Sequence, residues 1–318
     1  MVEREALSRY CNLPTVTKNG VKKAVYGNIG KPEDVQAVVQ NGGEGIGLFR
    51  TEFLFMDRMS RPTEAEQFEA YATVAKAMNG REVIIRTLDI GGDKEIPYLE
   101  IEKEDNPFLG HRAIRYCLDH PDLFCDQIRA ILRAAKFGDL KLMLPLITCK
   151  EEILAAKKLI EQCLRELIEA GEDVHPVPVG IMVETPAAAL TAAELAKEAD
   201  FFSIGTNDLT GYVMAVDRGN QAVARLYDPM QPAVLSAIEM TIKAAKAAGI
   251  PVGMCGEGAA DPRLIPPSAG VGTGRIFRVC FFYSENPQDD QRGRSVNIVP
   301  FTAPLGNKGS RRILRLRG

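Results

Sequence analysis

The chain has 318 residues, of which 46% are apolar, and a formal net charge of −3. This length and composition fit one large soluble α/β domain, indicate no membrane insertion, and disfavour a nucleic-acid partner. The seven cysteines form no C-x-x-C pair and the first residues lack a secretory signal pattern. We therefore disfavour a disulfide framework or a zinc site and expect a cytoplasmic protein.

Short apolar runs alternate with helical segments along most of the chain. Residues 1–23 have the pattern of a helix end and a linker, which we expect to follow an N-terminal domain that is missing here. Seven strand candidates come next, at residues 24–30, 45–52, 82–94, 141–148, 177–185, 200–208 and 251–257. Helix candidates separate them, at residues 32–40, 63–78, 150–170, 186–198 and 232–248, with extra helix over 109–136. This alternation predicts a (β/α)₈ TIM barrel over residues 24–266.

Polar side chains fall at the carboxyl ends of the predicted strands. They are Arg50, Arg86, Glu184, Asn207, Asp208 and Cys255. In β/α barrels this face carries the active site. Each residue alone also has a structural interpretation, as a surface ion pair, a helix cap or a packed thiol. Their shared position favours one functional site.

The residue types at this face suit a phosphorylated acid and a divalent cation. Arg50, Arg86 and Arg218 offer more positive charge than a monocarboxylate needs, and a phosphate carries about two negative charges. Glu184 and Asp208 can each give one oxygen to Mg²⁺, which usually takes one or two protein carboxylates. We therefore expect a small phosphorylated acid bound together with Mg²⁺.

Cys255 is the candidate for proton transfer. A thiol has a reference pKa of about 8.5, so at neutral pH it is mostly protonated and can act as a general acid toward carbon. The alternative is a buried cysteine that packs as a small hydrophobic side chain.

Six segments, in this order along the chain, resemble the C-terminal, phosphoenolpyruvate-binding barrel of enzyme I of the bacterial sugar phosphotransferase system. They are GIGLFRTEFLFMDR, RTLDIGGDK, NPFLGHRAIR, MVETPAAA, DFFSIGTNDLTGYVMAVDRGN and GMCGE, and the resemblance runs from Val25 to Arg263. It implies contacts to phosphoenolpyruvate and Mg²⁺ and one acid that protonates the enolate to give pyruvate. The implied substrate contacts are Arg50, Arg86, Arg112, Asn207, Asp208 and Arg218, the implied Mg²⁺ ligands are Glu184 and Asp208, and the implied acid is Cys255.

The resemblance also implies partners. In that family the phosphate passes to a histidine on a separate N-terminal domain and then to a histidine-containing phosphocarrier protein, the first step of sugar uptake. His111, His120 and His175 stand outside the Gly-rich context of that histidine, so we expect them to be structural or solvent-facing. This chain should bind phosphoenolpyruvate without completing the transfer alone, and the resemblance implies a homodimer.

Two other interpretations stay open. The barrel domain of pyruvate phosphate dikinase or phosphoenolpyruvate synthase would share the fold, and a non-catalytic phosphoenolpyruvate-binding module would keep the barrel without the chemistry. The segments at residues 49–58 and 205–220 favour enzyme I.

Residues 267–318 form a basic tail, with nine Lys/Arg against three Asp/Glu and no helical periodicity. The family would continue here with a helix, an eighth strand and a closing helix. A shifted reading frame is our hypothesis for this tail, and resequencing the source gene tests it. Residues 275–283 are the candidate eighth strand. We expect an atypical eighth β/α unit whose completeness the sequence leaves open.

Overall fold

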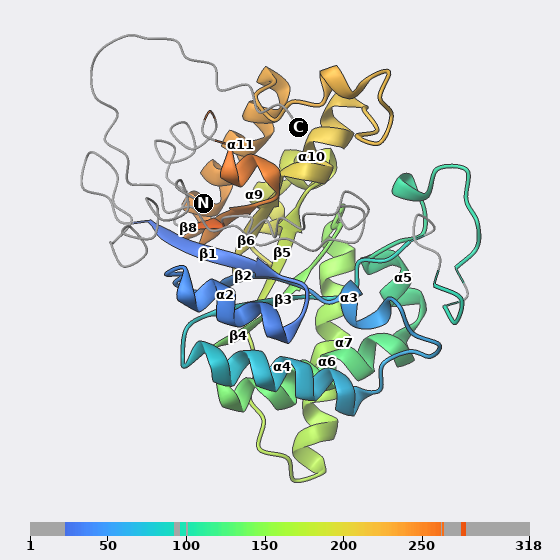
Figure 1. Ribbon diagram of the computed structural model, residues 1–318, viewed down its shortest axis with the longest axis vertical. Coiled ribbons are helices and arrows are strands. Elements are labelled where there is room, and N and C mark those ends of the chain that lie inside the picture. Colours follow the sequence, from blue (N-terminus) through green and yellow to red (C-terminus); the bar gives the residue numbers. More distant parts are fainter. Residues whose placement is uncertain (1–22, 92–95, 100, 262, 264–274, 278–318) are drawn as a thin grey trace.

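The computed structural model describes residues 23–91, 96–99, 101–261, 263 and 275–277 (Figure 1). Its strands form one sheet in the order β7-β6-β5-β4-β3-β2-β1-β8, and each neighbouring pair is parallel. The strands are β1 (Ala24–Ile29), β2 (Ile46–Arg50), β3 (Val83–Arg86), β4 (Leu140–Leu144), β5 (Val179–Val183), β6 (Phe202–Gly205), β7 (Val252–Cys255) and β8 (Arg275–Phe277). The predicted α/β class with a curled parallel sheet is therefore confirmed.

Helices connect successive strands and flank the sheet (Figure 1). They are α2 (Val35–Gln40), α3 (Glu52–Phe55), α4 (Glu64–Met78), α5 (Ile114–Asp119), α6 (Pro121–Ala134), α7 (Lys150–Glu169), α8 (Pro186–Leu190), α9 (Ala192–Leu195), α10 (Thr206–Met214) and α11 (Pro232–Ala248). Local signals set their ends. Thr63 and Glu66 form a capping box at the start of α4, and Gly249 ends α11 with a φ of 71°.

Side chains along each strand alternate between two apolar clusters. Those that face the helices join the main core, and Ile85 and Ile181 are examples. Those on the other face form a smaller cluster inside the curl of the sheet, with Tyr26, Leu48, Ile84, Met143, Met182, Phe201 and Cys255. Because the period is two, the residues that follow Ile84 and Met182 on this inner face are Arg86 and Glu184. The inner face thus becomes polar where the strands end.

The eighth strand lies beside the first, with Ala24, Val25 and Tyr26 in register with residues 275–277. β8 also approaches β7, but across the described residues the hydrogen-bonded order ends at β7 on one side and at β8 on the other. The expected linker, apart from Lys23, and the basic tail, apart from β8, lie outside the described residues. A fully closed barrel stays a prediction.

Two local expectations were wrong. The helix expected over residues 186–198 is divided into α8 and α9 at Thr191, which is the C-cap of the first and the N-cap of the second. Asn207 and Asp208, expected at the end of a strand over residues 200–208, lie in the first turn of α10, which begins directly after β6. Among the described helices, none is both long and apolar enough to cross a membrane.

Candidate active site

Arg50 and Arg86 stand side by side at the carboxyl ends of β2 and β3, where they are register partners. Arg86 is buried, and its guanidinium contacts Glu52 Oε1 at 2.8 Å and Asp89 Oδ2 at 2.9 Å. Burial lowers the pKa of Arg86, but these two carboxylates outweigh it and raise the pKa above its ordinary value. Arg50 is half-buried and stacks on Phe53, with its Cζ 4.7 Å from the ring centroid.

Arg112 extends this row of charges toward α10. Its Nη2 donates to Asp89 Oδ1 at 2.8 Å and to Asp208 Oδ2 at 3.4 Å. Gly91 lets the two segments approach, since a Cβ there would lie 2.4 Å from Arg112 Cβ. The result is a chain of ion pairs from Glu52 through two arginines and Asp89 to Asp208. It joins residues that are far apart in the sequence.

Glu184 directly follows β5 and is buried, with 3% of its surface exposed. Its Oε1 accepts the backbone N–H of Leu146 at 2.7 Å. The carboxylate leans over Gly205 at the end of β6, where a Cβ would lie 2.7 Å from Glu184 Oε2. Burial, together with the charges of Asp208 and Asp89, raises the pKa of Glu184 to about 8.

Asn207 is held by two hydrogen bonds. Its Oδ1 accepts the backbone N–H of Glu257 at 2.8 Å, and its backbone carbonyl accepts the Tyr227 hydroxyl at 2.8 Å. Gly256, with a φ of 85°, leaves room for this contact, because a Cβ there would lie 2.8 Å from Asn207 Oδ1. The N-cap of α10 is Gly205 and forms no side-chain capping bond. The interpretation of Asn207 and Asp208 as mere helix caps therefore fails.

Cys255 ends β7 and is buried against the inner apolar cluster. Its Sγ accepts from Ser203 Oγ at 3.5 Å and donates to the Ile204 carbonyl at 3.5 Å. Burial raises the pKa of this thiol to about 12. The side chain is thus a thiol and not a thiolate at neutral pH.

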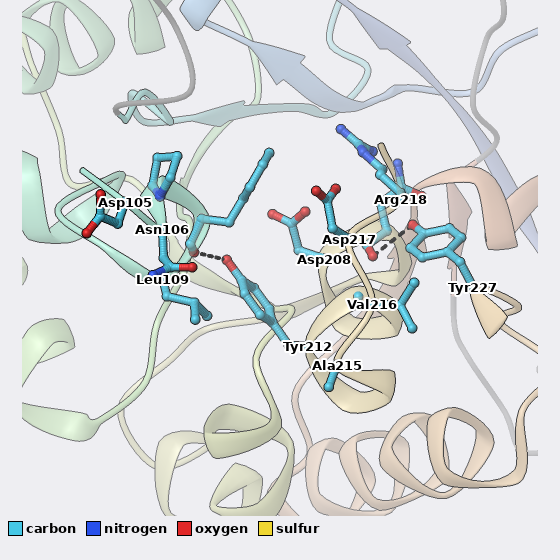
Figure 2. Close-up of a pocket in the computed structure, with 14 residues that line it drawn as sticks. Asp105, Asn106, Leu109, Asp208, Tyr212, Ala215, Val216, Asp217, Arg218 and Tyr227 are labelled. Carbon is cyan, nitrogen blue, oxygen red and sulfur yellow. Dashed lines mark hydrogen bonds between the residues drawn. The ribbon is translucent and has the colours of Figure 1, made fainter. Parts of the chain in front are cut away.

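A pocket of about 560 Å³ opens beside α10 (Figure 2). Asp105 and Leu109 line one side of it, and Arg218 and Tyr227 line the other (Figure 2). Of the predicted site residues, Asn207, Asp208 and Arg218 line this pocket, while Arg50, Arg86, Arg112, Glu184 and Cys255 are not among its lining residues. Arg112 joins the two groups through its contact with Asp208.

Glu52 and Asp89 also belong to this site, although neither was predicted from the sequence. Both stand within three residues of a predicted arginine, in the segments FRTE and RTLD. Acidic residues that close to a strand-end arginine are the signal that could have identified them. They matter because each fixes the guanidinium of Arg86.

The donors present fit Mg²⁺. The charge of Asp208 adds to the cost of ionising Glu184, as the raised pKa of Glu184 indicates, and a cation held by these carboxylates would relieve that repulsion. Within the described ranges, no group of three or more His, Cys, Asp or Glu side chains gathers as a metal cluster. A magnesium ion here would therefore complete its shell with substrate oxygens and water, as Mg²⁺ commonly does.

Comparison with known proteins identifies the family. Residues 4–277 match the family described as "PEP-utilising enzyme, PEP-binding domain". The chain belongs to this family. Several curated relatives carry the name phosphoenolpyruvate-protein phosphotransferase. The one from Bacillus subtilis (strain 168) is 50% identical over 273 residues, which are 86% of this chain and 48% of the relative. The one from Haemophilus influenzae is 53% identical over 271 residues, 85% of this chain and 47% of the relative.

This member of the family spans about half the length of the curated relatives that it matches. Among solved structures, a citrate lyase from Burkholderia xenovorans LB400 is 21% identical, with a TM-score of 0.47 over 79% of this chain and 77% of that chain. A likeness at that level carries no argument about function.

Proposed function

We propose that the carboxyl-end face of the sheet binds phosphoenolpyruvate with Mg²⁺, as the binding domain of a phosphoenolpyruvate-protein phosphotransferase. One observation supports this most. Within the described part of the chain, four buried guanidinium nitrogens of the site arginines lack a hydrogen-bond acceptor: Arg50 Nε, Arg86 Nε, Arg112 Nε and Arg112 Nη1. Buried N–H groups are seldom left unpaired. A phosphate with three oxygens would supply the acceptors.

In this proposal each residue has a defined role, and Asp208 has two. Arg50, Arg86, Arg112 and Arg218 hold the phosphate, and Asn207 and Asp208 contact the substrate. Glu184 and Asp208 hold Mg²⁺, which, when bound, neutralises charge on the phosphate oxygens. The names of the curated relatives favour this function over that of a dikinase or a synthase.

The phosphoryl group leaves the enol oxygen for a histidine on a separate N-terminal domain, and the remaining enolate takes a proton at its methylene carbon to become pyruvate. We assign that proton to Cys255. With a pKa of about 12 the thiol keeps its proton until a strong base forms beside it. The thiol must turn away from the Ile204 carbonyl to deliver it.

The proposal also covers the domain bounds, the oligomeric state, the cellular location and the downstream partner. A (β/α)₈ barrel domain over residues 24–266 with an atypical eighth unit, a basic tail from residue 267, a homodimer and a cytoplasmic location are included in it. So is onward transfer to a histidine-containing phosphocarrier protein in sugar uptake. These statements rest on the resemblance and on the relatives' shared name.

Calorimetric titration of phosphoenolpyruvate, with and without Mg²⁺, tests the proposal. We expect saturable binding that is tighter with Mg²⁺. Arg50→Met should weaken it by at least about tenfold, since a charge-assisted contact to phosphate is lost. Arg165→Met is the matched control, because it removes the same charge from an exposed position on α7. No binding in either condition, or equal losses in both variants, would reject the proposal.

A further inference from the structure

A buried amide on α6 connects the two loops that directly follow Arg50 and Arg86. Gln127 is fully buried, and it is the one polar side chain among the buried residues of that helix. Its neighbours on the helix face, such as Phe124 and Ile131, are apolar core residues. A buried amide amid such neighbours needs hydrogen-bond partners, because an unpaired one is costly.

Gln127 finds those partners on three different elements. Its Oε1 accepts the backbone N–H of Leu88 at 2.9 Å, and its Nε2 donates to Thr51 Oγ1 at 3.1 Å and to Tyr71 Oη at 3.0 Å. The direction of the amide is fixed chemically. The Leu88 N–H can only donate, so the amide oxygen must face it and the amide nitrogen must face the two hydroxyls.

The network continues into the backbone of the site. The Thr51 hydroxyl accepts from Gln127 and donates to the carbonyl oxygen of Arg86 at 2.8 Å. Thr51 stands between Arg50 and Glu52, and Leu88 stands beside Asp89. One side chain on α6 therefore holds the loop after β2 and the loop after β3 in a fixed relation.

That relation sets the charge geometry of the site. The contact of Arg86 with Glu52, at 2.8 Å, joins these same two loops, while Arg86 also contacts Asp89 of its own loop at 2.9 Å. A displacement of one loop relative to the other by about 1 Å would break the contact with Glu52, and displacements of that size can cost about a hundredfold in function.

We propose that Gln127 is a positioning residue for phosphoenolpyruvate binding: it acts through Thr51 and Leu88 on the arginines and touches no substrate. The inference rests on the proposed function. Tyr71 is at the far end of the network. Its hydroxyl donates to Gln67 Oε1 at 3.1 Å, and Gln67 belongs to α4 and not to a site loop. Losing the Tyr71 hydroxyl removes a buried hydrogen bond from Gln127 without releasing either loop.

The test compares Gln127→Met with Tyr71→Phe in the full 318-residue chain. Both remove buried hydrogen bonds, but only the first frees the Leu88 N–H. Amide hydrogen exchange should accelerate over residues 87–89 by at least about tenfold in Gln127→Met and change little in Tyr71→Phe. Calorimetry with Mg²⁺ should show phosphoenolpyruvate affinity reduced by about tenfold in the first variant and by less than about twofold in the second.

Thr51→Val, which keeps the shape and removes the hydroxyl, provides a second variant if Gln127→Met does not fold. It should lower the affinity in the same direction. Equal effects of the Gln127 and Tyr71 changes would overturn the inference, as would faster exchange without loss of affinity. Absence of binding by the unmodified chain would instead reject the proposed function. The exchange comparison would then still decide whether Gln127 orders the two loops.

Discussion

Glu184 provides the sharpest test of the metal assignment. Its pKa of about 8 means that about nine tenths of these side chains carry a proton at pH 7. A magnesium ion binds the carboxylate and not the acid, so cation binding must displace that proton. We expect a release of about 0.9 proton per site at pH 7, about 0.5 at pH 8 and about 0.1 at pH 9. Glu184→Gln should bind Mg²⁺ weakly and release no proton from this site.

The raised pKa of Glu184 also predicts how the stability of the metal-free chain depends on pH. The ordinary pKa of the group is 4.5 and the folded value is about 8, so the folded state binds more protons between these values. The free energy of unfolding should therefore fall as the pH rises through this window, by up to about 1.4 kcal/mol per pH unit. Glu184→Gln should flatten that slope, and Mg²⁺ should offset the loss near pH 8 because it binds only the folded site.

Titration calorimetry in two buffers with different ionisation enthalpies measures the released proton directly. The matched control is Glu161→Gln, an exposed position on α7. Mg²⁺ binding at pH 7 without proton release would refute the reasoning. So would a release in Glu184→Gln equal to that in the unmodified chain.

Three further changes test neighbouring parts of the site. Gly205→Ala would place a Cβ 2.7 Å from Glu184 Oε2. It should destabilise the fold by about 1–3 kcal/mol and weaken Mg²⁺ binding measured by calorimetry. Unchanged Mg²⁺ affinity would contradict this prediction. Arg112→Met removes one of the positive charges that compensate the buried carboxylate of Asp89. It should lower the free energy of unfolding, measured in urea, by on the order of 3 kcal/mol. A loss no larger than that of Arg165→Met would argue against a structural role for this ion pair. Cys255→Ala should abolish exchange of the C3 protons of pyruvate, followed by NMR in deuterated water, and undiminished exchange would remove the thiol as the acid.

The placement of the site residues at strand ends was predictable because it is local. Buried strands have a period of two, so an inner position after Ile84 or Met182 could be identified as Arg86 or Glu184 from the sequence alone. The structure ends β2 at Arg50, β3 at Arg86 and β7 at Cys255, as expected. The roles of these residues remain predictions.

The contacts that orient these side chains were not predictable, because they are non-local. Arg112 and Asp208 are 96 positions apart, and Gln127 reaches back 39 positions to Leu88 and 76 to Thr51. In the sequence, Gln127 resembles any polar residue on an amphipathic helix. Only the packing of α6 against the loops shows that its amide is buried. The start of α10 was missed because the strand was expected to run to residue 208, whereas the chain passes directly from strand to helix after Gly205.

The three arginines at this sheet edge differ in how completely they are already neutralised. Arg86 is held by two carboxylates at 2.8 and 2.9 Å, and Arg112 by one at 2.8 Å and a second, looser one at 3.4 Å. Among the described residues, no carboxylate lies within ion-pair distance of Arg50, and burial lowers its pKa. A guanidinium that is buried without a close counter-charge is stabilised most by a bound anion, because the anion replaces the favourable interaction with water that burial removed. We therefore predict that Arg50 is the main phosphate-binding charge of the three and that Arg86 and Arg112 chiefly hold the geometry around it.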